Sequence, residues 1–438
     1  MGDTEERDTG EGWGQGTIEG AICSAVNLDN GVRDFFTGSE YEVSYGDLML
    51  GPALFQDDVS RLCEDPVSVQ MGNDRMEAMA ETKLLDFNME KSCLIVIGKK
   101  KVRADMENKL AENPPLLYGQ KMKQVPAEKY LGDQISSGGL AESVTATVTK
   151  RTGRVLQSIF EIRTIIDDCR SHVSGGLITG LEIWEMAVIP YLTNNCDSWM
   201  NIPAKTIEEL DNLQNLFYRV LLSVPTGCPK PIMYWDCHGL SMKLRVAQKK
   251  LLFLHHLATL DDDSLAKQVY NVQSKLALPG LVQECQEYLV KFGICDITRY
   301  SKPQWKRLIQ KCIENLNREM LLDKMKTSYK KLDHNKFAEE KFELQPYLTN
   351  LNLNQARQNF RIRSFMTKTV KMNFPNDVGY KRESWKCQDC QSIDTQSHIQ
   401  HCPAYEHLRA GKDLGNDQDM VKYFQQVIAL RESDDEKE

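Results

Sequence analysis

The sequence predicts an α+β protein in which short strands lie in the first third of the chain and helices make up most of the rest. Three observations support this fold class. Residues 46–63 consist of short apolar runs interrupted by Gly-Pro and Asp-Asp, which is typical of strands around a tight turn. Beyond Leu140, apolar residues recur at helical spacing. Near the end, residues 387–402 hold three cysteines and, at a suitable spacing from them, His398, which indicates a small metal-stabilised module.

The strand region has further elements on either side of this turn. Residues 1–11 are almost entirely polar or charged and predict a disordered acidic segment. Residues 76–88 have helical spacing, whereas residues 92–98 (SCLIVIG) predict a buried strand. A further strand that ends in a turn is expected around Tyr130.

After Leu140 the sequence predicts a succession of helices. Residues 143–170 form one long helical pattern, and residues 240–260 form another. Thr206 and Glu209 have the spacing of a capping box, in which the hydroxyl and the carboxylate each accept a backbone N–H at a helix start. The sequence therefore predicts that a helix begins at Thr206.

Charge is unevenly distributed along the chain. The net charge is −8, yet residues 299–372 hold 17 Lys/Arg and 7 Asp/Glu, a local net of +10. A phosphate-binding surface needs local positive charge, so this region is a candidate for nucleic-acid binding. Trp305, Tyr329 and Phe360 lie among these cations, where they would either stack on bases or pack in the core. The simpler alternative is a solvated, charged helical face.

Cysteine usage and hydropathy indicate where the protein works. The 13 cysteines are an odd number and are widely scattered, which suits free thiols in a reducing compartment. There is no run of eighteen apolar residues, so no membrane span is expected. These features predict an intracellular protein of the nucleus or cytoplasm.

Asp57 and Asp58 lie where a hydrophobic strand is expected to reverse. Adjacent carboxylates at a hairpin tip repel each other, so they are tolerated mainly when the tip is solvated or a divalent cation binds there. Mg²⁺ takes oxygen ligands and usually binds through one or two carboxylates together with phosphate oxygens. The pair is therefore either a magnesium site for phosphoryl transfer or an ordinary solvated turn.

The Cys/His segment has the spacing of a zinc site. Cys387 and Cys390 are separated by two residues, and His398 and Cys402 are four apart, as on one helical face. Four protein ligands close the coordination sphere, which predicts structural rather than catalytic zinc. The segment holds few large apolar residues, so a metal would explain how it folds. His401 and His407 are the alternatives to His398 as the fourth ligand.

Four short elements follow one another in the first third of the chain: Gly14-Gln15-Gly16, Phe55-Gln56-Asp57-Asp58, Asn88 with Lys91-Ser92, and Tyr130-Leu131-Gly132. In kind and order they resemble the palm of reverse transcriptases from non-LTR (LINE-type) retrotransposons. The resemblance covers roughly residues 12–135. The Cys/His segment likewise resembles the zinc knuckle found downstream of the polymerase in some of these elements, which is taken to hold template RNA or target DNA.

The resemblance implies roles for these residues. Gly14, Gln15 and Gly16 would form the turn that positions template and nucleotide. Asp57 and Asp58 would bind catalytic Mg²⁺, and Lys91 would lie near the phosphates of the incoming nucleotide. The implied partners are an RNA template, a DNA primer or target and, in an active enzyme, dNTPs.

The resemblance also divides the chain into regions. They are an acidic stub (1–11), a partial reverse-transcriptase palm (12–139), a helical thumb and connector (140–297), a basic helical region (298–375), a zinc knuckle (376–412), and a short helix with an acidic tail (413–438).

Two departures from the family pattern limit the expected activity. Gln56 is an unusual residue at the middle position of the Asp-Asp hairpin. The family also takes a third carboxylate from an apolar strand upstream of the Gly-Gln-Gly turn, and Asp3 and Asp8 have no apolar surroundings. The chain is therefore expected to be the C-terminal part of a reverse transcriptase, with a truncated palm and little or no polymerase activity by itself.

Three functions remain open at this point. The first is a fragment of an RNA-directed DNA polymerase, and the second is a non-catalytic protein that holds nucleic acid through the basic helices and the zinc knuckle. The third is a helical scaffold that binds no nucleic acid. Salt-dependent binding that falls when Lys306 and Arg307, or Arg361 and Arg363, are reversed in charge would contradict the scaffold.

Overall fold

The computed structural model describes residues 28–36, 43–168, 175–328, 334–367 and 386–435. Helices predominate and the sheets are small, which confirms the α+β class. The chain forms two compact units, each built from segments that are separate in the sequence. Unit 1 comprises Met1–Ala146, Trp199–Asn201 and Leu254–Thr298; unit 2 comprises Thr147–Ser198, Ile202–Phe253 and Arg299–Glu438. Residues 254–298 thus belong to unit 1, together with the first 146 residues.

The described strands all lie in unit 1 and form five two-stranded sheets. Four are antiparallel hairpins: β1(Val43–Tyr45) with β2(Leu48–Leu50), β3(Ala53–Phe55) with β4(Asp58–Ser60), β6(Leu116–Leu117) with β7(Gln120–Lys121), and β9(Ala127–Tyr130) with β10(Asp133–Ser136). The fifth pairs β5(Cys93–Leu94) in parallel with β8(Lys123–Gln124). The buried strand expected over residues 92–98 is thus reduced to two half-buried residues.

Two of these hairpins contact each other directly. In the β3–β4 hairpin, Phe55 pairs with Asp58, and the turn residue Gln56 has a positive φ of 56°. In the β9–β10 hairpin, Leu131 and Gly132 have φ of 48° and 94°, as a tight two-residue turn requires. The hydroxyls of Ser60 and Tyr130 lie 3.1 Å apart and join the hairpins.

A small hydrophobic core anchors these strands to helices. The helix at residues 28–35 and α2(Pro66–Lys83) contribute most of its buried side chains. Leu54 and Val59 of the β3–β4 hairpin pack against this core. A capping box fixes the start of α2, because the Asp65 carboxylate accepts the backbone N–H of Ser68 at 2.7 Å and the Ser68 hydroxyl accepts that of Asp65.

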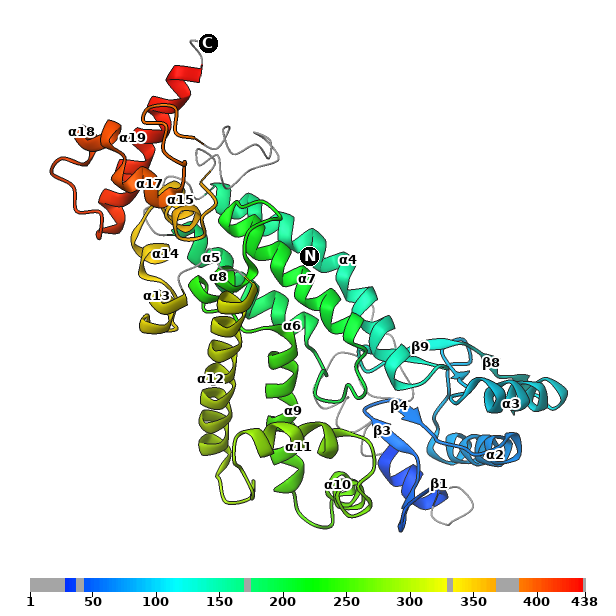
Figure 1. Ribbon diagram of the computed structural model, residues 1–438. Coiled ribbons are helices and arrows are strands. Elements are labelled where there is room, and N and C mark those ends of the chain that lie inside the picture. Colours follow the sequence, from blue (N-terminus) through cyan, green and yellow to red (C-terminus); the bar gives the residue numbers. More distant parts are fainter. Residues whose placement is uncertain (1–27, 37–42, 169–174, 329–333, 368–385, 436–438) are drawn as a thin grey trace, which may run out of the picture. The chain divides into compact units, whose positions relative to one another are not determined.

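The remaining elements of unit 1 are helical. They are α3(Lys100–Glu112), which lies beside α2 (Figure 1), the first part of α4(Leu140–Asp168), and α10(Leu265–Leu276) and α11(Leu281–Lys291). An exposed ion pair of 2.9 Å between Asp47 and Lys275 connects the β1–β2 hairpin with α10.

Unit 2 consists of helices throughout its described part. Its first half holds the rest of α4, α5(Gly175–Ile183), the π-helical turn η3(Trp184–Val188), α6(Ile189–Leu192), α7(Ala204–Leu222), α8(Lys230–Asp236) and most of α9(Met242–Ala258). The capping box expected at Thr206 is wrong. Helix α7 begins two residues earlier, directly after Pro203, and Thr206 is buried inside it.

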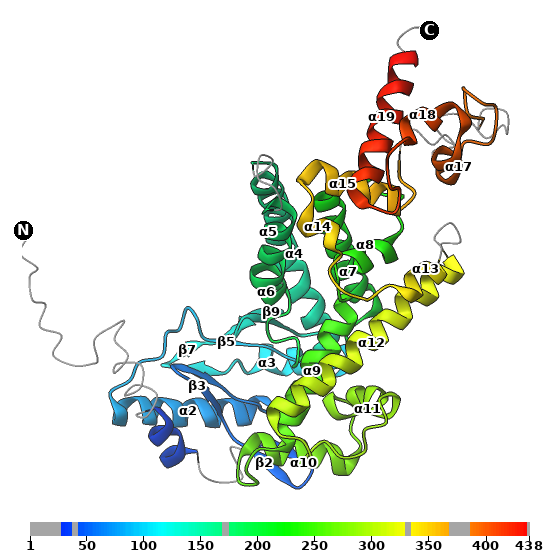
Figure 2. The same cartoon turned by 90° about the vertical axis from the view of Figure 1, so that its left-hand side faces the viewer.

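The second half of unit 2 begins with a long helix, α12(Lys302–Ser328), which passes α8 and α9 (Figures 1 and 2). The Trp305 indole N–H donates to the carbonyl of Leu251 in α9 at 2.9 Å. The later helices are α13(His334–Glu339), α14(Pro346–Asn350), α15(Leu353–Arg363), α17(Gln396–His401), α18(Glu406–Arg409) and α19(Asp417–Asp435), with a 3-10 turn, η6(Pro403–Tyr405), between α17 and α18. Among the described residues, no helix combines the length and apolarity needed to cross a membrane.

Candidate metal centre

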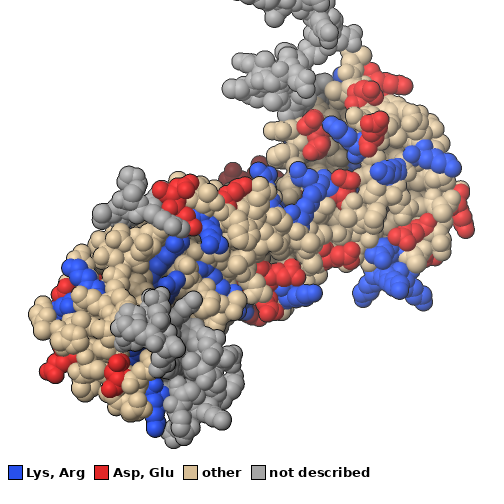
Figure 3. Space-filling model, turned by 90° about the horizontal axis from the view of Figure 1, so that it is seen from above, with Lys and Arg blue, Asp and Glu red and all other residues tan. Residues whose placement is uncertain are grey.

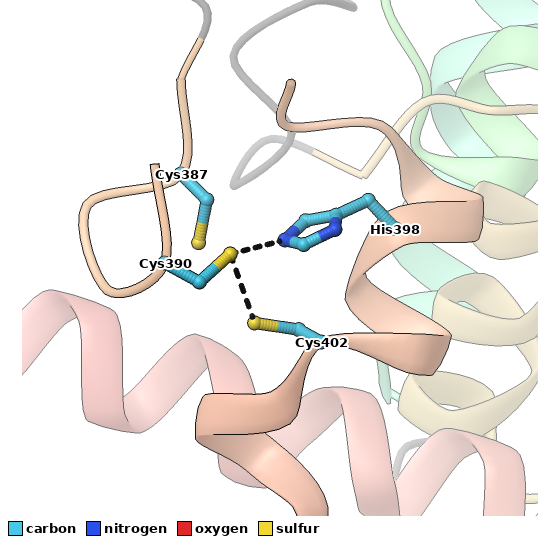
Figure 4. A group of neighbouring side chains, drawn as sticks. All are labelled: Cys387, Cys390, His398 and Cys402. Atoms are coloured by element: carbon cyan, nitrogen blue, oxygen red, sulfur yellow. Dashed lines mark hydrogen bonds between the residues drawn. The ribbon is translucent and has the colours of Figure 1, made fainter. Parts of the chain in front are cut away.

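The four predicted ligands of the C-terminal Cys/His segment lie together. The Sγ atoms of Cys387, Cys390 and Cys402 and a ring nitrogen of His398 all lie within 4.8 Å of one another. Figure 4 shows the four side chains pointing into one space. Cys390 Sγ is 3.1 Å from His398 Nε2 and 3.6 Å from Cys402 Sγ. A tetrahedron with Zn–S bonds of about 2.3 Å has edges of about 3.8 Å, so these residues can hold a metal such as zinc.

Local structure explains why the ligands converge. The two cysteines of the first pair lie in a tight loop that an isolated β-bridge between Lys386 and Ile393 closes. Thr395 then caps α17, because its hydroxyl accepts the backbone N–H of His398 at 2.9 Å. His398 therefore projects from the first turn of α17, and Cys402 follows directly at its end.

The pKa shifts of two of the donor groups, His398 and Cys390, favour metal binding. Burial lowers the pKa of His398, which keeps the imidazole neutral and able to donate a lone pair. Burial opposes ionisation of Cys390, but hydrogen bonds from Ser392, Cys402 and Cys387 together outweigh it and lower the pKa of this thiol. Burial raises the pKa of Cys402 to about 11, so a cation is needed to hold its thiolate at neutral pH. Because all four positions come from protein, a metal ion held here would have a closed coordination sphere, as in structural sites.

The two alternative histidines lie outside this cluster. His401 is exposed, and its Nδ1 is bonded to the carbonyl of Ser397 at 2.9 Å. His407 is exposed on α18. Among the described residues, His398 is the histidine that completes the three-cysteine set.

A buried polar network joins this cluster to α19. Arg431 forms a bidentate ion pair with Asp394, with both N–O distances at 2.9 Å, and Asp394 is fully buried. The same guanidinium donates to Cys387 Sγ at 3.5 Å and to the Tyr405 hydroxyl at 2.7 Å. Tyr405 in turn donates to Asp389, between the first two cysteines. Arg431 therefore holds the loop that carries the first cysteine pair against α19.

Helix α19 also supplies hydrophobic residues that the Cys/His segment lacks. Its Val421, Tyr423, Phe424 and Val427 are fully buried, as are Ile399 and Tyr405 of the Cys/His segment. The sequence predicts one short helix after residue 412, whereas α19 has 19 residues. One sequence signal was available, since Val421, Phe424 and Val427 recur at helical spacing and Arg431 follows on the same face. The metal cluster and α19 thus form one folded module, residues 386–435, which we call the C-terminal module.

Asp57 and Asp58 lie at the tip of the β3–β4 hairpin, as predicted, and both are exposed. Among the described residues, no third histidine, cysteine or carboxylate joins them in a metal-binding group. The Mg²⁺ site therefore stays a prediction.

Lys91 is exposed in a loop that Asn88 organises. The Asn88 side chain accepts the backbone N–H groups of Glu90 and Lys91 at 3.0 and 3.2 Å. The Asn-x-x-Lys spacing therefore also has a structural explanation, because the Asn88 side chain stabilises the turn that carries Lys91. Gly14, Gln15 and Gly16 lie outside the described residues.

Several cations of the basic region are partly buried and bonded within the fold. Arg363 donates to the fully buried Asp236 at 2.9 and 3.0 Å and also pairs with Glu340. Arg361 donates to the carbonyl of Ser223 at 2.7 Å, just past the end of α7. Both arginines therefore stabilise unit 2, and reversing their charge would damage the fold. Trp305 and Phe360 are likewise core residues, and Tyr329 lies outside the described residues.

Comparison with known proteins does not assign the chain to a family. No protein-family model matches it, and no curated protein matches it. The resemblance to reverse transcriptases therefore stays a prediction, carried by the four short elements quoted above.

Proposed function

We propose that this protein binds nucleic acid, that it descends from a non-LTR reverse transcriptase, and that its C-terminal module is organised by zinc. The observation that carries the proposal is the closed Cys387, Cys390, His398 and Cys402 cluster, which directly follows the region of local charge +10. A folded, metal-held module beside a cationic region fits a protein that holds a polyanion.

The charge distribution supports a local rather than a global binding surface. On the face drawn in Figure 3, Lys and Arg side chains are interspersed with Asp and Glu side chains. The net charge of −8 also excludes a uniformly basic protein. Binding must therefore depend on particular cations, which makes it sensitive to single substitutions and to salt.

We expect the zinc-loaded protein to bind labelled 20-nucleotide RNA or 20-base-pair DNA with an affinity that falls steeply between about 50 and 200 mM salt. Fluorescence anisotropy measures this directly. The His398→Ala variant should bind more weakly than wild type, because the C-terminal module loses its metal. Its matched control, His401→Ala, should bind like wild type. Absence of salt-dependent binding by the zinc-loaded protein would favour the scaffold function instead.

RNA-directed DNA polymerisation with Mg²⁺ is a second candidate, favoured by the packing of unit 1. The hairpin that carries Asp57 and Asp58 bonds to the hairpin of Tyr130 through Ser60. Phe87 and Met89, which flank Asn88, pack on the same core as the Asp-Asp hairpin. Three of the four elements that resemble the polymerase palm are therefore close neighbours in the fold.

Asp57→Asn separates the two candidates. If the protein polymerises DNA, this variant should lose on the order of 100-fold or more in template-dependent primer extension, because the metal would be misplaced. The exposed Asp86→Asn in the same unit serves as control. If the protein only binds nucleic acid, neither variant should change affinity, and extension should be absent in wild type as well.

A further inference from the structure

We propose that the exposed side of the first half of α12 is the surface that docks the phosphodiester backbone of nucleic acid. This α12 basic surface consists of Lys302, Lys306, Arg307 and Lys311. The inference rests on the proposed nucleic-acid binding and assigns it to particular side chains.

The four cations are accessible. Each is exposed, and within the described part of the chain none of them has an ion-pair or hydrogen-bond partner. Several other cations of the basic region are bonded within the fold. Arg357 donates to the carbonyl of Leu221, and Arg318 donates to that of Ala338, in addition to the internal arginines of α15. The α12 basic surface therefore accounts for much of the charge left available to a ligand.

Helix stability does not explain these residues. Lys302 and Lys306 are four residues apart, as are Arg307 and Lys311, so each pair sets like charges side by side on the helix. They occupy the N-terminal half of α12, where the helix dipole disfavours cations, and the first turn holds no acidic residue. Each effect costs a few tenths of a kcal/mol to about 1 kcal/mol. A bound polyanion would offset both the repulsion between the like charges and their unfavourable interaction with the helix dipole.

The surroundings of the four cations fit a polyanion better than a protein partner. In this half of α12, Trp305, Ile309 and Ile313 are buried, and Leu308 is half-buried. No large hydrophobic side chain of α12 is exposed, whereas protein interfaces usually centre on such residues. From Lys302 to Lys311 the helix rises roughly 14 Å. On each strand of duplex DNA one phosphate falls per about 3.4 Å of helix axis, so about four phosphates of one strand fall within that axial length.

The test compares Lys306→Gln/Arg307→Gln with Lys324→Gln/Lys326→Gln in the full-length, zinc-loaded protein. The second pair removes the same charge from exposed positions in the other half of the same helix. Anisotropy with 20-nucleotide RNA is measured from 0.1 to 1 M salt. For two lost contacts, the slope of log affinity against log salt should shrink by about 1.4 on single strands and about 1.8 on duplex. If the variant and the wild type bind RNA equally at 1 M salt, the variant should bind about 25-fold more weakly than the wild type at 0.1 M salt.

The outcomes separate the two proposals. A selective effect of the first pair supports the α12 basic surface. Equal effects of both pairs, or no effect of the first while wild type still binds, overturn this surface but leave nucleic-acid binding intact. Failure of wild type to bind RNA or DNA overturns the proposed function itself. If the first pair instead weakens binding to phosphatidylserine/phosphatidylcholine vesicles and not to nucleic acid, the surface serves a membrane and the inference is wrong.

Discussion

Replacing His398 with alanine is expected to remove zinc from the protein and to unfold the C-terminal module. Metal binding at a structural Cys/His site is worth about 10–16 kcal/mol near pH 7, which exceeds the stability of most domains. A closed site that loses one of four ligands keeps only a small part of that energy. Zinc content by elemental analysis should fall from one ion per chain to near zero. Hydrogen exchange over residues 386–435 should rise, while unit 1 keeps its protection.

His401→Ala is the matched control for this experiment. Both histidines belong to α17, but the ring of His401 is exposed and bonded to a backbone carbonyl outside the cluster. This variant should retain one zinc ion and normal protection. Retention of zinc by His398→Ala, or its loss from His401→Ala, would show that the fourth ligand is wrongly assigned.

Arg431→Met is expected to weaken both zinc binding and the fold of the C-terminal module. The substitution leaves the fully buried Asp394 carboxylate without its ion-pair partner, which typically costs 3–5 kcal/mol. It also removes the N–H that Arg431 donates to Cys387 Sγ. Loss of such an outer contact typically lowers metal affinity about 10- to 100-fold. Competition with a chromophoric zinc chelator measures the affinity, and chemical denaturation at saturating zinc measures the stability.

Two companion variants give this prediction its controls. Lys422→Met replaces an exposed cation of the same helix and should behave like wild type. Arg431→Lys keeps the positive charge but loses the planar fork that serves Asp394, Tyr405 and Cys387 together, so it should lie between wild type and Arg431→Met. If Arg431→Met binds zinc within about threefold of wild type, Arg431 does not support the metal site.

The sequence predicts local features of this fold well and long-range ones poorly. The turn at Asp57 and Asp58 is encoded by neighbouring residues, and the structure has a hairpin there. By contrast, the strand expected over residues 92–98 shrinks to Cys93–Leu94, because its length depends on β8, which only two residues form. The start of α7 illustrates competition between signals. Pro203, with its fixed backbone angle, begins the helix ahead of the capping pattern at Thr206.

The candidate metal centre shows the same contrast between local features, which the sequence predicts, and long-range contacts, which it does not. All four ligands were predicted, because zinc sites are recognised by short spacing within one segment. Arg431 was not, because its contact with Cys387 depends on how α19 folds back, which no local pattern encodes. The sequence predicts residues 299–372 as one basic region, but the structure separates its cations into bonded and exposed ones. Arg361 and Arg363 turn inward, whereas Lys306 and Arg307 stay exposed, and net charge alone does not distinguish these cases.

The placement of the ligands has a consequence for the order in which the C-terminal module assembles. Cys387 to Cys402 is a short segment, so closing it around a metal ion costs little chain entropy, and such loops close within about 100 ns. The contacts of Arg431 close a longer loop and need α19 to be formed already. We therefore expect capture of the metal to come first and to provide the surface against which α19 packs. In metal-poor conditions we expect the apolar face of this helix, including Phe424 and Val427, to be exposed and to promote aggregation.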